Sequence, residues 1–366
     1  FVANREEGIA RYKAMLTPAQ HKARIAAGDT ENLVPKFTMP AGEPPVFPVL
    51  LRRREEMAEG VAKYEFTALD GQPLPPFDAG AHIDIVIAPE YQRQYSLAGD
   101  PADRSKYVLG VLREPPEGVG RGGSALMHRA FREGRKVFIT KPTNHFPLYE
   151  DAVMSLLFAG GIGVTPMIAM AHRLYALGKP FALHYSAASR RTAGFLEDLA
   201  QMPWKGSVHY HFKDEGARAD LQALMPPYAA SMHVYTCGAP RFMDGVFAAA
   251  AARGWPEDAM HREYFSVPEA DAWVNHAFTL RLARTGRTLE VPADRSATDV
   301  LAQAGIKVDT KCSDGLCGVC ATPYDASASG EVEHRDFVLG SQERTHKIIL
   351  CCSRPKAAGG SLVVDL

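Results

Sequence analysis

A group of cysteines near the C-terminus restricts the fold of this chain more than any other feature. Cys312, Cys317 and Cys320 follow one another as C-x₄-C-x₂-C, and Cys351 comes 31 residues after the third. A loop with this spacing is typical of proteins in which four thiolates hold a [2Fe-2S] cluster. Glycines inside the loop let its backbone wrap closely around the sulfurs. We therefore expect these four cysteines to bind a cluster that accepts one electron at a time.

Other interpretations of the cysteines stay open at this point. A zinc ribbon would show two C-x₂-C pairs, whereas this loop has one. The cysteines could also form disulfides, but two of the six, Cys237 and Cys352, lie outside the group of four. Spare thiols suit a reducing compartment, so the sequence predicts a cytoplasmic protein. Cys352 is also an alternative to Cys351 as the fourth ligand.

Length and charge exclude several classes of partner. A chain of 366 residues with 46% hydrophobic residues is long enough for two or three domains, each with its own core. Lys and Arg number 41 against 42 Asp and Glu, and no apolar run has the length of a membrane span. We expect neither a nucleic acid nor a membrane as partner.

The pattern along the chain predicts an N-terminal extension and three domains. The pattern of residues 1–45 predicts a helix over 18–27 followed by a proline-rich connector. We interpret the helix as a clamp between two domains or as an oligomerisation element. Short strands follow in 46–148, and one helix begins near Ser124, which suggests a small antiparallel barrel. The six predicted strands cover residues 49–54, 62–69, 81–87, 93–98, 107–113 and 136–140.

Beyond the barrel, the pattern of elements changes twice. Strands and helices alternate over 149–266, as in a domain with a parallel sheet. Residues 267–275 have the composition of a linker, and the cluster domain occupies 276–366.

A glycine-rich turn in the third segment has the features of an anion site. An apolar strand over 154–158 leads into Gly160, Gly161 and Gly163, and Thr165-Pro166 then opens an amphipathic helix. Glycine lets the backbone approach a pyrophosphate, and the helix N-terminus favours its charge. The acidic residue of the standard dinucleotide fingerprint is missing about 20 positions later. Arg190 and Arg191 follow that segment, either as surface residues or as partners of a 2′-phosphate, and we favour the surface interpretation.

A second loop combines the same features. The residues Arg121, Gly122, Gly123 and Ser124 bring backbone amides, a hydroxyl, a guanidinium and a helix start together, a combination that suits a terminal phosphate. On an earlier strand, alternation places Arg93 and Tyr95 on one side and Ser96 on the other. Taken alone, that strand is better interpreted as a barrel strand with an exposed arginine.

These motifs, in this order, resemble the phthalate dioxygenase reductase family. The resemblance begins near residue 46 and runs to the end. Arg93-x-Tyr95-Ser96 resembles the flavin motif of the family, residues 121–124 its FMN phosphate loop, and residues 160–166 its NADH pyrophosphate turn. Three further segments resemble the family's nicotinamide segment, the strand end that closes over its flavin, and its ferredoxin tail. They are Cys237-Gly238, residues 261–265, and His334-Arg-Asp336 with residues 351–354.

The resemblance implies a multidomain fold and a set of roles. The fold would comprise an antiparallel β-barrel flavin domain, an α/β nucleotide-binding domain with a parallel sheet, and an α+β plant-type ferredoxin domain. Tyr95 and Phe265 would flank the flavin of FMN, with Ser96 near its N5. Arg93 and residues 121–124 would hold the phosphate, and Gly160, Gly161, Gly163, Pro166 and Gly238 would contact NADH. The implied catalytic residues are Ser96, Thr165, Cys237 and Glu263, with Thr165 and Cys237 orienting the nicotinamide.

The implied activity is electron transfer in three stages. NADH delivers two electrons as a hydride and a [2Fe-2S] cluster accepts one, so a flavin must stand between them. The acceptor implied by the resemblance is a Rieske-type oxygenase that acts on an aromatic or similar small substrate.

Two alternative functions share these motifs. One is a diaphorase or a reductase for a cytochrome P450, and the other is an electron-carrier module without hydride chemistry of its own. His209 and His211 also lie on one face of a strand, but we find no third metal ligand at useful spacing.

Overall fold

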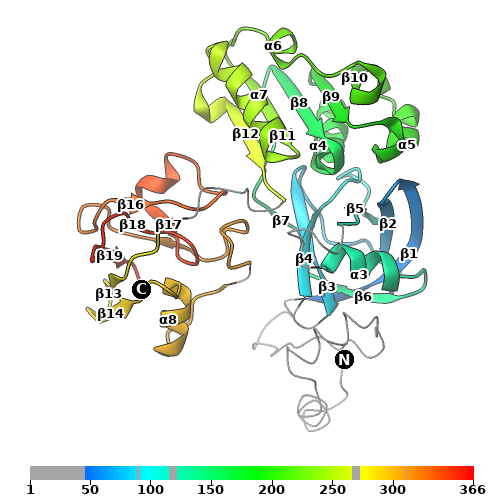
Figure 1. Ribbon diagram of the computed structural model, residues 1–366. Helices are drawn as coiled ribbons and strands as arrows, with labels where there is room; N and C mark the ends of the chain where they lie inside the picture. The colour runs from blue at the N-terminus through cyan, green and yellow to red at the C-terminus, as the bar shows by residue number, and fades with distance from the viewer. Residues whose placement is uncertain (1–45, 89–90, 115–121, 266–272, 311) are drawn as a thin grey trace. The chain divides into compact units, whose positions relative to one another are not determined.

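The structure is a computed structural model, and it describes residues 46–88, 91–114, 122–265, 273–310 and 312–366 (Figure 1). The helix predicted over 18–27, its connector and Arg121 lie outside these residues. The chain divides into two compact units, one reaching to Ala239 and including Ala248–Trp255, the other comprising Pro240–Phe247 and Pro256–Leu366. Among the helices that the structure describes, none is long and apolar enough to cross a bilayer.

An antiparallel barrel begins the described chain, as the strand pattern predicts. Its sheet has the order β4-β3-β6-β1-β2-β5, with the two-residue β7 beside β3. An antiparallel bridge joins Leu97, which follows β4, to Leu109 in β5, and this bridge closes the barrel. The six predicted strands are present with slightly shifted ends, and β7 was not expected. The elements are β1 (Phe47–Ala58), β2 (Val61–Ala68), β3 (Ala81–Ala88), β4 (Tyr91–Ser96), β5 (Tyr107–Leu112), α3 (Gly123–Ala130), β6 (Lys136–Ile139) and β7 (Thr143–Asn144).

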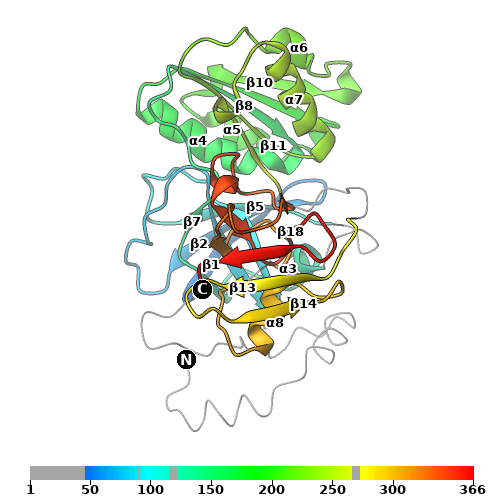
Figure 2. The same ribbon diagram turned by 90° about the vertical axis from the view of Figure 1, so that its left-hand side faces the viewer.

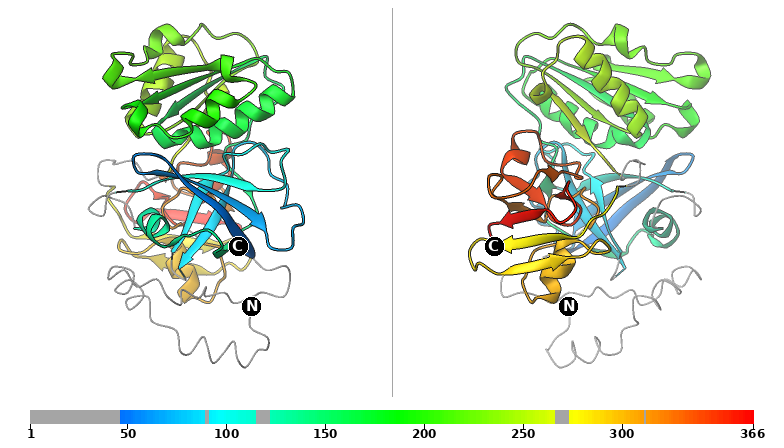
Figure 3. Two further views of the ribbon diagram at one scale, coloured as in Figure 1. Left: turned by 90° about the vertical axis from the view of Figure 1, so that its right-hand side faces the viewer. Right: turned by 60° about the vertical axis from the view of Figure 1, so that its left-hand side comes forward.

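Local sequence explains the shape of the barrel. Gly60, with φ of 73°, makes the turn between β1 and β2, a position where a left-handed backbone favours glycine. Register shifts at Leu51/Arg53 and Glu56/Ala58 accompany the curvature of β1, which the blue ribbon of Figure 3 makes visible. Alternating residues of the strands, Tyr64 and Phe66 among them, fill the interior.

A parallel sheet follows the barrel. The strands β10, β9, β8 and β11 lie side by side in that order, and each pair is parallel. Their buried runs of Leu, Phe and Tyr are typical of strands with both faces covered. We refer to β8–β11 with α4–α6 as the parallel-sheet lobe. Its elements are β8 (Met154–Gly160), η1 (Gly161–Gly163), α4 (Val164–Ala176), β9 (Phe181–Ala187), α5 (Leu196–Gln201), β10 (Val208–Phe212), α6 (Leu221–Leu224) and β11 (Met232–Cys237).

The rest of the chain begins with α7 (Pro240–Ala252) and β12 (Met260–Glu263) and ends in a small module built around two short sheets and one longer one. In the C-terminal module, residues 273–366, β13 pairs antiparallel with β14 and parallel with β19 (Figure 2). Its elements are β13 (Phe278–Leu282), β14 (Thr288–Val291), α8 (Ala297–Gln303), β15 (Ala321–Pro323), β16 (Val332–Glu333), β17 (Lys347–Ile349), β18 (Arg354–Pro355) and β19 (Ser361–Val364). These three parts confirm the predicted fold class.

Arg335 attaches the first residues of the C-terminal module to the rest of it. Arg335 donates from Nη1 to Oδ1 of Asn275 over 2.6 Å and from Nη2 to the carbonyl of Val274 over 3.0 Å. Its guanidinium carbon also lies 5.1 Å from the centre of the Trp273 ring. The last residues of the predicted linker are therefore held against the module, while the domain boundaries themselves stay predictions.

Candidate functional site

The first part of the site is the meeting point of β4 with the start of α3. A Cβ on Gly123 would lie 2.8 Å from Cγ and 3.0 Å from Nε of Arg93, so the arginine packs directly on the glycine backbone. Gly122, the N-cap, has a left-handed φ of 74°. No acidic residue stands in the first turn of α3. The guanidinium and the helix N-terminus thus give one small region a positive potential, as an anion site requires.

The neighbouring side chains arrange a polar and an aromatic group beside this region. In the pairing of β4 with β3, Tyr95 lies opposite Ile83 and Ser96 opposite His82, so Tyr95 and Ser96 face opposite sides. Ser96 is buried, and burial raises the pKa of the Tyr95 phenol, which stays neutral. The hydroxyl of Ser124 accepts a hydrogen bond from the backbone N–H of Glu114 over 3.1 Å.

The second part of the site is the glycine turn between β8 and α4. A Cβ on Gly163 would lie 2.2 Å from the carbonyl oxygen of Cys237, a distance that excludes any side chain. Gly238, with φ of 156°, approaches Gly160 in the same way, since a Cβ there would lie 2.9 Å from the Cα of Gly160. Two segments more than 70 residues apart in sequence are thus in backbone contact. Glycine is required at these positions because backbone atoms cannot move aside as a flexible side chain can.

The position of this contact in the sheet favours ligand binding. The chain runs from β8 outward through β9 to β10, and then β11 returns to the other side of β8. Ligands of open α/β sheets bind at such a switch point, outside the carboxyl ends of the strands. Thr165, in the first turn of α4, is buried and donates its hydroxyl to the carbonyl of Ile162 over 3.1 Å. The Cys237 thiol is fully buried at the end of β11.

Two predicted residues follow β11 at some distance in the chain. Glu263 ends β12 and is half-buried, and Phe265 is 45% exposed. The guanidinium of Arg262, in β12, forms an ion pair of 3.2 Å with the carboxylate of Asp244, in α7. Both residues belong to the second compact unit, so their proximity to a flavin stays a prediction.

The third part of the site is the group of four cysteines proposed from the sequence, whose sulfurs are in contact with one another in pairs. The sulfur of Cys312 is in hydrogen-bonding contact with those of Cys317 and Cys351, and the sulfur of Cys320 contacts that of Cys351. These shared protons lower the pKa of Cys312 through Cys317 and Cys351, and they raise the pKa of Cys317 through Cys312. The thiol of Cys351 lowers the pKa of Cys320 to about 7. Four sulfurs close enough to share protons are a donor set that fits a cluster of two irons.

Backbone groups of the loop point at these sulfurs. The N–H of Asp314 donates to Sγ of Cys312 over 3.4 Å, and the N–H of Val319 is in hydrogen-bonding contact with Cys317. Gly315 has φ of 75°, and a Cβ there would lie 2.8 Å from Sγ of Cys352. The loop therefore has the N–H donors that stabilise negative sulfur ligands, and its glycine is required for the close approach of Cys352.

Cys351 and Cys352 occupy different positions. Sγ of Cys351 is in hydrogen-bonding contact with the sulfurs of Cys312 and Cys320 and also with that of Cys352, whereas Sγ of Cys352 contacts Cys351 alone among the described ligand candidates, lies over Gly315 and is 3.8 Å from the carbonyl oxygen of Ile349. This arrangement favours Cys351 as the fourth ligand.

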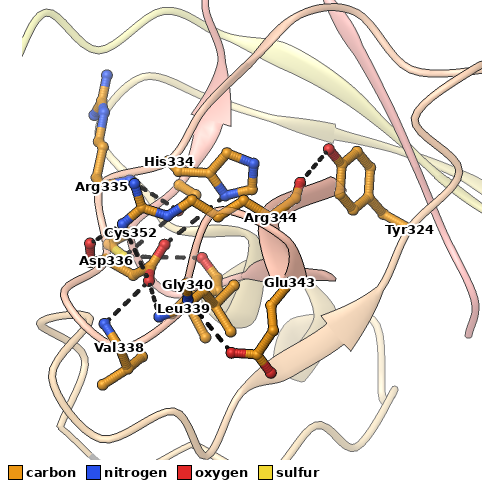
Figure 4. A network of polar contacts seen from close by, with 12 residues as sticks. Tyr324, His334, Arg335, Asp336, Val338, Leu339, Gly340, Glu343, Arg344 and Cys352 are labelled. Carbon is orange, nitrogen blue, oxygen red and sulfur yellow. Dashed lines mark hydrogen bonds and ion pairs between the residues drawn. The ribbon is translucent and has the colours of Figure 1, made fainter. Parts of the chain in front are cut away.

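The buried carboxylate of Asp336 lies at the centre of a network of polar contacts near Cys352 (Figure 4). The Asp336 side chain is 0% exposed, and Oδ1 accepts the N–H groups of Val338 and Leu339 over 3.2 and 2.8 Å. The guanidinium of Arg344 lies 3.6 Å from Oδ1 and donates to the Asp336 carbonyl over 2.8 Å. Because the next residue, Phe337, donates its N–H to the carbonyl of Gly315 over 3.0 Å, this network holds the cluster loop in place.

Sequence reasoning missed two features. The first is Gly110 in β5, where a Cβ would lie 2.5 Å from the ring of Phe195 and 2.8 Å from Cγ2 of Thr165. An isolated glycine inside an apolar strand is a signal of close backbone approach, and it could have drawn attention to this position.

The second missed feature is His184, the third histidine near His209 and His211. The parallel register places it opposite His209, with Nδ1 3.2 Å from Nε2 of His211. Its ring is stacked on that of His209, with centres 5.0 Å apart and planes at 24°. Rings stacked in nearly parallel planes do not aim their nitrogens at one ion, so the arrangement favours a hydrogen-bonded stack over a metal site. Burial and the two neighbouring histidines lower the pKa of His184 to about 4.

Comparison with known proteins gives a consistent result. The family model of the 2Fe-2S iron-sulfur cluster binding domain matches residues 280–356. A tert-butanol monooxygenase / tert-amyl alcohol desaturase reductase subunit from Aquincola tertiaricarbonis is 42% identical and covers 84% of this chain and 92% of its own. The solved structure of phthalate dioxygenase reductase is 36% identical with a TM-score of 0.62, and the match covers 88% of this chain and 98% of that one.

A second solved structure is longer than this chain. An intact type IV self-sufficient cytochrome P450 monooxygenase has a TM-score of 0.79 and 32% identity, over 96% of this chain and 44% of that one. This chain thus spans less than half of that protein.

Proposed function

The chain belongs to the phthalate dioxygenase reductase family, and from this premise we propose that it is the reductase component of an oxygenase system. It is an NADH-dependent flavin iron–sulfur oxidoreductase that takes a hydride onto FMN and passes single electrons through a [2Fe-2S] cluster. The observation that carries this function is the contact of the sulfur of Cys351 with those of a loop of three cysteines whose N–H groups point at the loop sulfurs.

The residues around Arg93 fit the requirements of FMN. Bound FMN would accept two electrons as a hydride and release them singly. The guanidinium of Arg93 and the N–H groups at the start of α3, with Arg121, Gly122, Gly123 and Ser124, would hold its phosphate. Tyr95 would pack on one face of the ring and Phe265 on the other, and Ser96 would hydrogen-bond to N5.

The glycine turn fits the pyrophosphate of NADH. Gly160, Gly161 and Gly163 keep side chains away from it, and α4 presents a helix N-terminus with no acidic residue in its first turn. Thr165 and Cys237, with Gly238 and Pro166 beside them, would orient the nicotinamide, and Glu263 would complete the catalytic group.

Arg190 and Arg191, which follow β9, are paired surface residues, as the surface interpretation of these arginines expects. The guanidinium of Arg190 pairs with Glu215 over 2.6 Å, and that of Arg191 pairs with Glu59 over 3.1 Å. Both arginines already have carboxylate partners, so a 2′-phosphate would have to displace them.

For the cluster, we propose Cys312, Cys317, Cys320 and Cys351 as the ligands and Cys352 as a supporting residue. The N–H donors around the sulfurs would stabilise the reduced, more negative cluster and so help to set its potential.

Rapid mixing with NADH in the absence of oxygen tests the proposed function. We expect the flavin absorbance to bleach first and the cluster absorbance to bleach later, because only the flavin accepts a hydride. A protein whose flavin is not bleached by NADH would instead be an electron-carrier module.

We propose a Rieske-type oxygenase as the acceptor, which the family membership supports. The C-terminal module has 11 Lys and Arg and 11 Asp and Glu between residues 276 and 366, so no net charge steers docking. Electron transfer to an isolated Rieske protein should accordingly depend weakly on ionic strength. Failure of the pre-reduced protein to reduce any Rieske centre would contradict this assignment.

A cytochrome P450 is the second candidate acceptor, because the match to the self-sufficient P450 monooxygenase covers nearly all of this chain. The two candidates are separated by mixing the pre-reduced protein with a Rieske oxygenase or with a P450 haem domain. Faster reduction of the haem than of the Rieske centre would favour the P450.

A further inference from the structure

Phe195 has an unusual backbone for a large buried side chain. Its φ of 64° and ψ of 10° lie in the left-handed region, and its side chain is 3% exposed. A bulky residue in this region is strained, and such strain persists only where the surrounding contacts enforce it. The carbonyl of the preceding Gly194 accepts the buried hydroxyl of Tyr185 over 3.1 Å, and the carbonyl of Phe195 accepts the N–H of Leu199 over 2.8 Å. The lobe therefore holds this residue on both sides.

The ring of Phe195 lies directly on the backbone of the barrel. A Cβ on Gly110, in β5, would lie 2.5 Å from Cε2 and 2.9 Å from Cζ of the ring. The same Cβ would lie 2.8 Å from Cγ2 of Thr165, in the first turn of α4. The ring and the threonine methyl group thus share the space that a side chain at Gly110 would fill. Both groups thus pack between the parallel-sheet lobe and β5.

From Gly110, a short path of backbone contacts leads to the flavin strand. Leu109, the preceding residue of β5, forms a bridge with Leu97, and the N–H of Ala98 donates to the carbonyl of Val108 over 2.8 Å. Ser96 directly precedes Leu97. The two residues proposed to meet the nicotinamide and the flavin N5, Thr165 and Ser96, are therefore linked through β5 without an intervening loop.

The segment around Phe195 is tied to the barrel at two further points. Nζ of Lys63, in β2, lies 2.8 and 2.9 Å from the two carboxylate oxygens of Asp198. The N–H of Glu59 donates to the carbonyl of Arg191 over 2.9 Å. A cavity of about 210 Å³ opens beside these contacts, and Phe195 is part of its wall. Next to this open space, the ring is a close apolar contact between the lobe and β5.

We infer that Phe195 is a positioning residue for hydride transfer: its strained backbone presses the ring onto Gly110 and sets the spacing between the nicotinamide turn and the flavin strand. The inference rests on the proposed function, because it assumes that NADH reduces a flavin at this place. It predicts that changes at Phe195 alter the rate of hydride transfer and leave the binding of NADH nearly unchanged.

The experiment compares Phe195→Ala and Phe195→Leu with the wild-type holoprotein. The limiting rate of flavin reduction at saturating NADH and the Kd of NADH are measured by anaerobic rapid mixing, together with FMN content and the cluster spectrum. We expect a loss of about tenfold or more in the limiting rate for Phe195→Ala, since misplacement of the reactants strongly slows transfer. Phe195→Leu should recover part of it. The deuterium isotope effect with NADH labelled at C4 should rise as transfer becomes rate-limiting.

A matched control is Phe212→Ala. Phe212 is an equally buried ring of the same lobe, and its ring contacts are with Tyr210 and Arg190. If loss of any buried ring from the lobe slowed flavin reduction, both alanine variants would be slowed similarly. The inference instead predicts a slow limiting rate for Phe195→Ala only.

Gly110→Ala tests the same contact without removing any side chain. Its methyl group would push the ring and Thr165 away from β5, so the limiting rate should fall here as well. The double variant with Phe195→Ala should be less impaired than the two single effects multiplied, because residues in contact are not additive.

The outcomes separate this inference from the proposed function. If the wild-type flavin is not reduced by NADH, the proposed function is wrong. If it is reduced, and Phe195→Leu and Gly110→Ala both reduce their flavin at the wild-type rate, the positioning role is wrong. That result decides the question even if Phe195→Ala does not fold.

Discussion

Replacing Gly163 with alanine should slow hydride transfer to the flavin sharply. The new Cβ would lie 2.2 Å from the carbonyl oxygen and 2.4 Å from the carbonyl carbon of Cys237, whereas real Cβ contacts stay above 3.0 Å. Both contacted atoms belong to backbone at the end of β11, so no side-chain rotation relieves the clash. The turn and the strand end must separate by about 1 Å.

The expected size follows from this displacement. A misplacement of about 1 Å between reacting groups costs roughly 10²-fold in rate, equivalent to about 2.7 kcal/mol of activation free energy. We therefore expect the limiting rate of flavin reduction by NADH in Gly163→Ala to fall by roughly two orders of magnitude. Reduction of the cluster by a chemical reductant should be unchanged, because the C-terminal module is unaffected.

Gly161→Ala is the matched control for the clash. Gly161 lies in the same turn with φ of 56°, and nothing lies within 4 Å of a Cβ there. Alanine at this position has the strain of a left-handed backbone, about 1–2 kcal/mol, but no collision. At saturating NADH, the limiting rate of flavin reduction should fall much less than in Gly163→Ala, even where the added methyl group weakens binding of the pyrophosphate. Equal losses in the two variants, or none in Gly163→Ala, would refute the reasoning from the backbone contact.

Three further predictions concern the cluster and the folded state. Cys351→Ser should lose iron and sulfide, whereas Cys352→Ser should keep them. If iron analysis shows the reverse, Cys352 is the fourth ligand and Cys351 is not. Asp336→Ala should lower the free energy of unfolding by about 2–4 kcal/mol, because two N–H groups lose a buried acceptor; Asp325→Ala, at an exposed turn, should lower it far less. The pKa of His184 is about 4 in the folded state, against 6.5 for an ordinary histidine, so below pH 6.5 the unfolded state binds more protons than the folded state. The free energy of unfolding should therefore be about 2 kcal/mol lower at pH 5 than at neutral pH. His184→Phe should flatten this dependence in urea unfolding, and an unchanged pH profile would contradict it.

The parts of the site that depend on neighbouring residues in the chain were predictable from the sequence. The cysteine spacing pointed to four thiols whose sulfurs lie in contact in pairs, while their role as ligands stays a prediction, and a glycine-rich strand-to-helix turn predicted the start of α4. Such features are encoded within a few consecutive residues, where turn chemistry and capping act directly. The strands of the barrel were also predictable, because alternation of apolar and polar residues has a period of two.

Contacts between distant segments could not be predicted in the same way. Nothing near Gly163 indicates that the carbonyl of Cys237 fills its side-chain space. Likewise, His184 joins His209 only through the register of two parallel strands. These facts depend on strand order and packing, which a single sequence does not reveal. The strained backbone of Phe195 is a further case, because local propensity argues against it and tertiary contacts enforce it.

An anaerobic titration of the purified protein with NADH, followed by absorbance, tests the central claim most directly. One FMN holds two electrons and one [2Fe-2S] cluster holds one, so the flavin and cluster bands should both bleach and reach an end point of about 1.5 NADH per chain. An end point of about 1 with an unbleached cluster, or bound zinc in place of iron, would contradict the claim that this chain converts a hydride into single electrons.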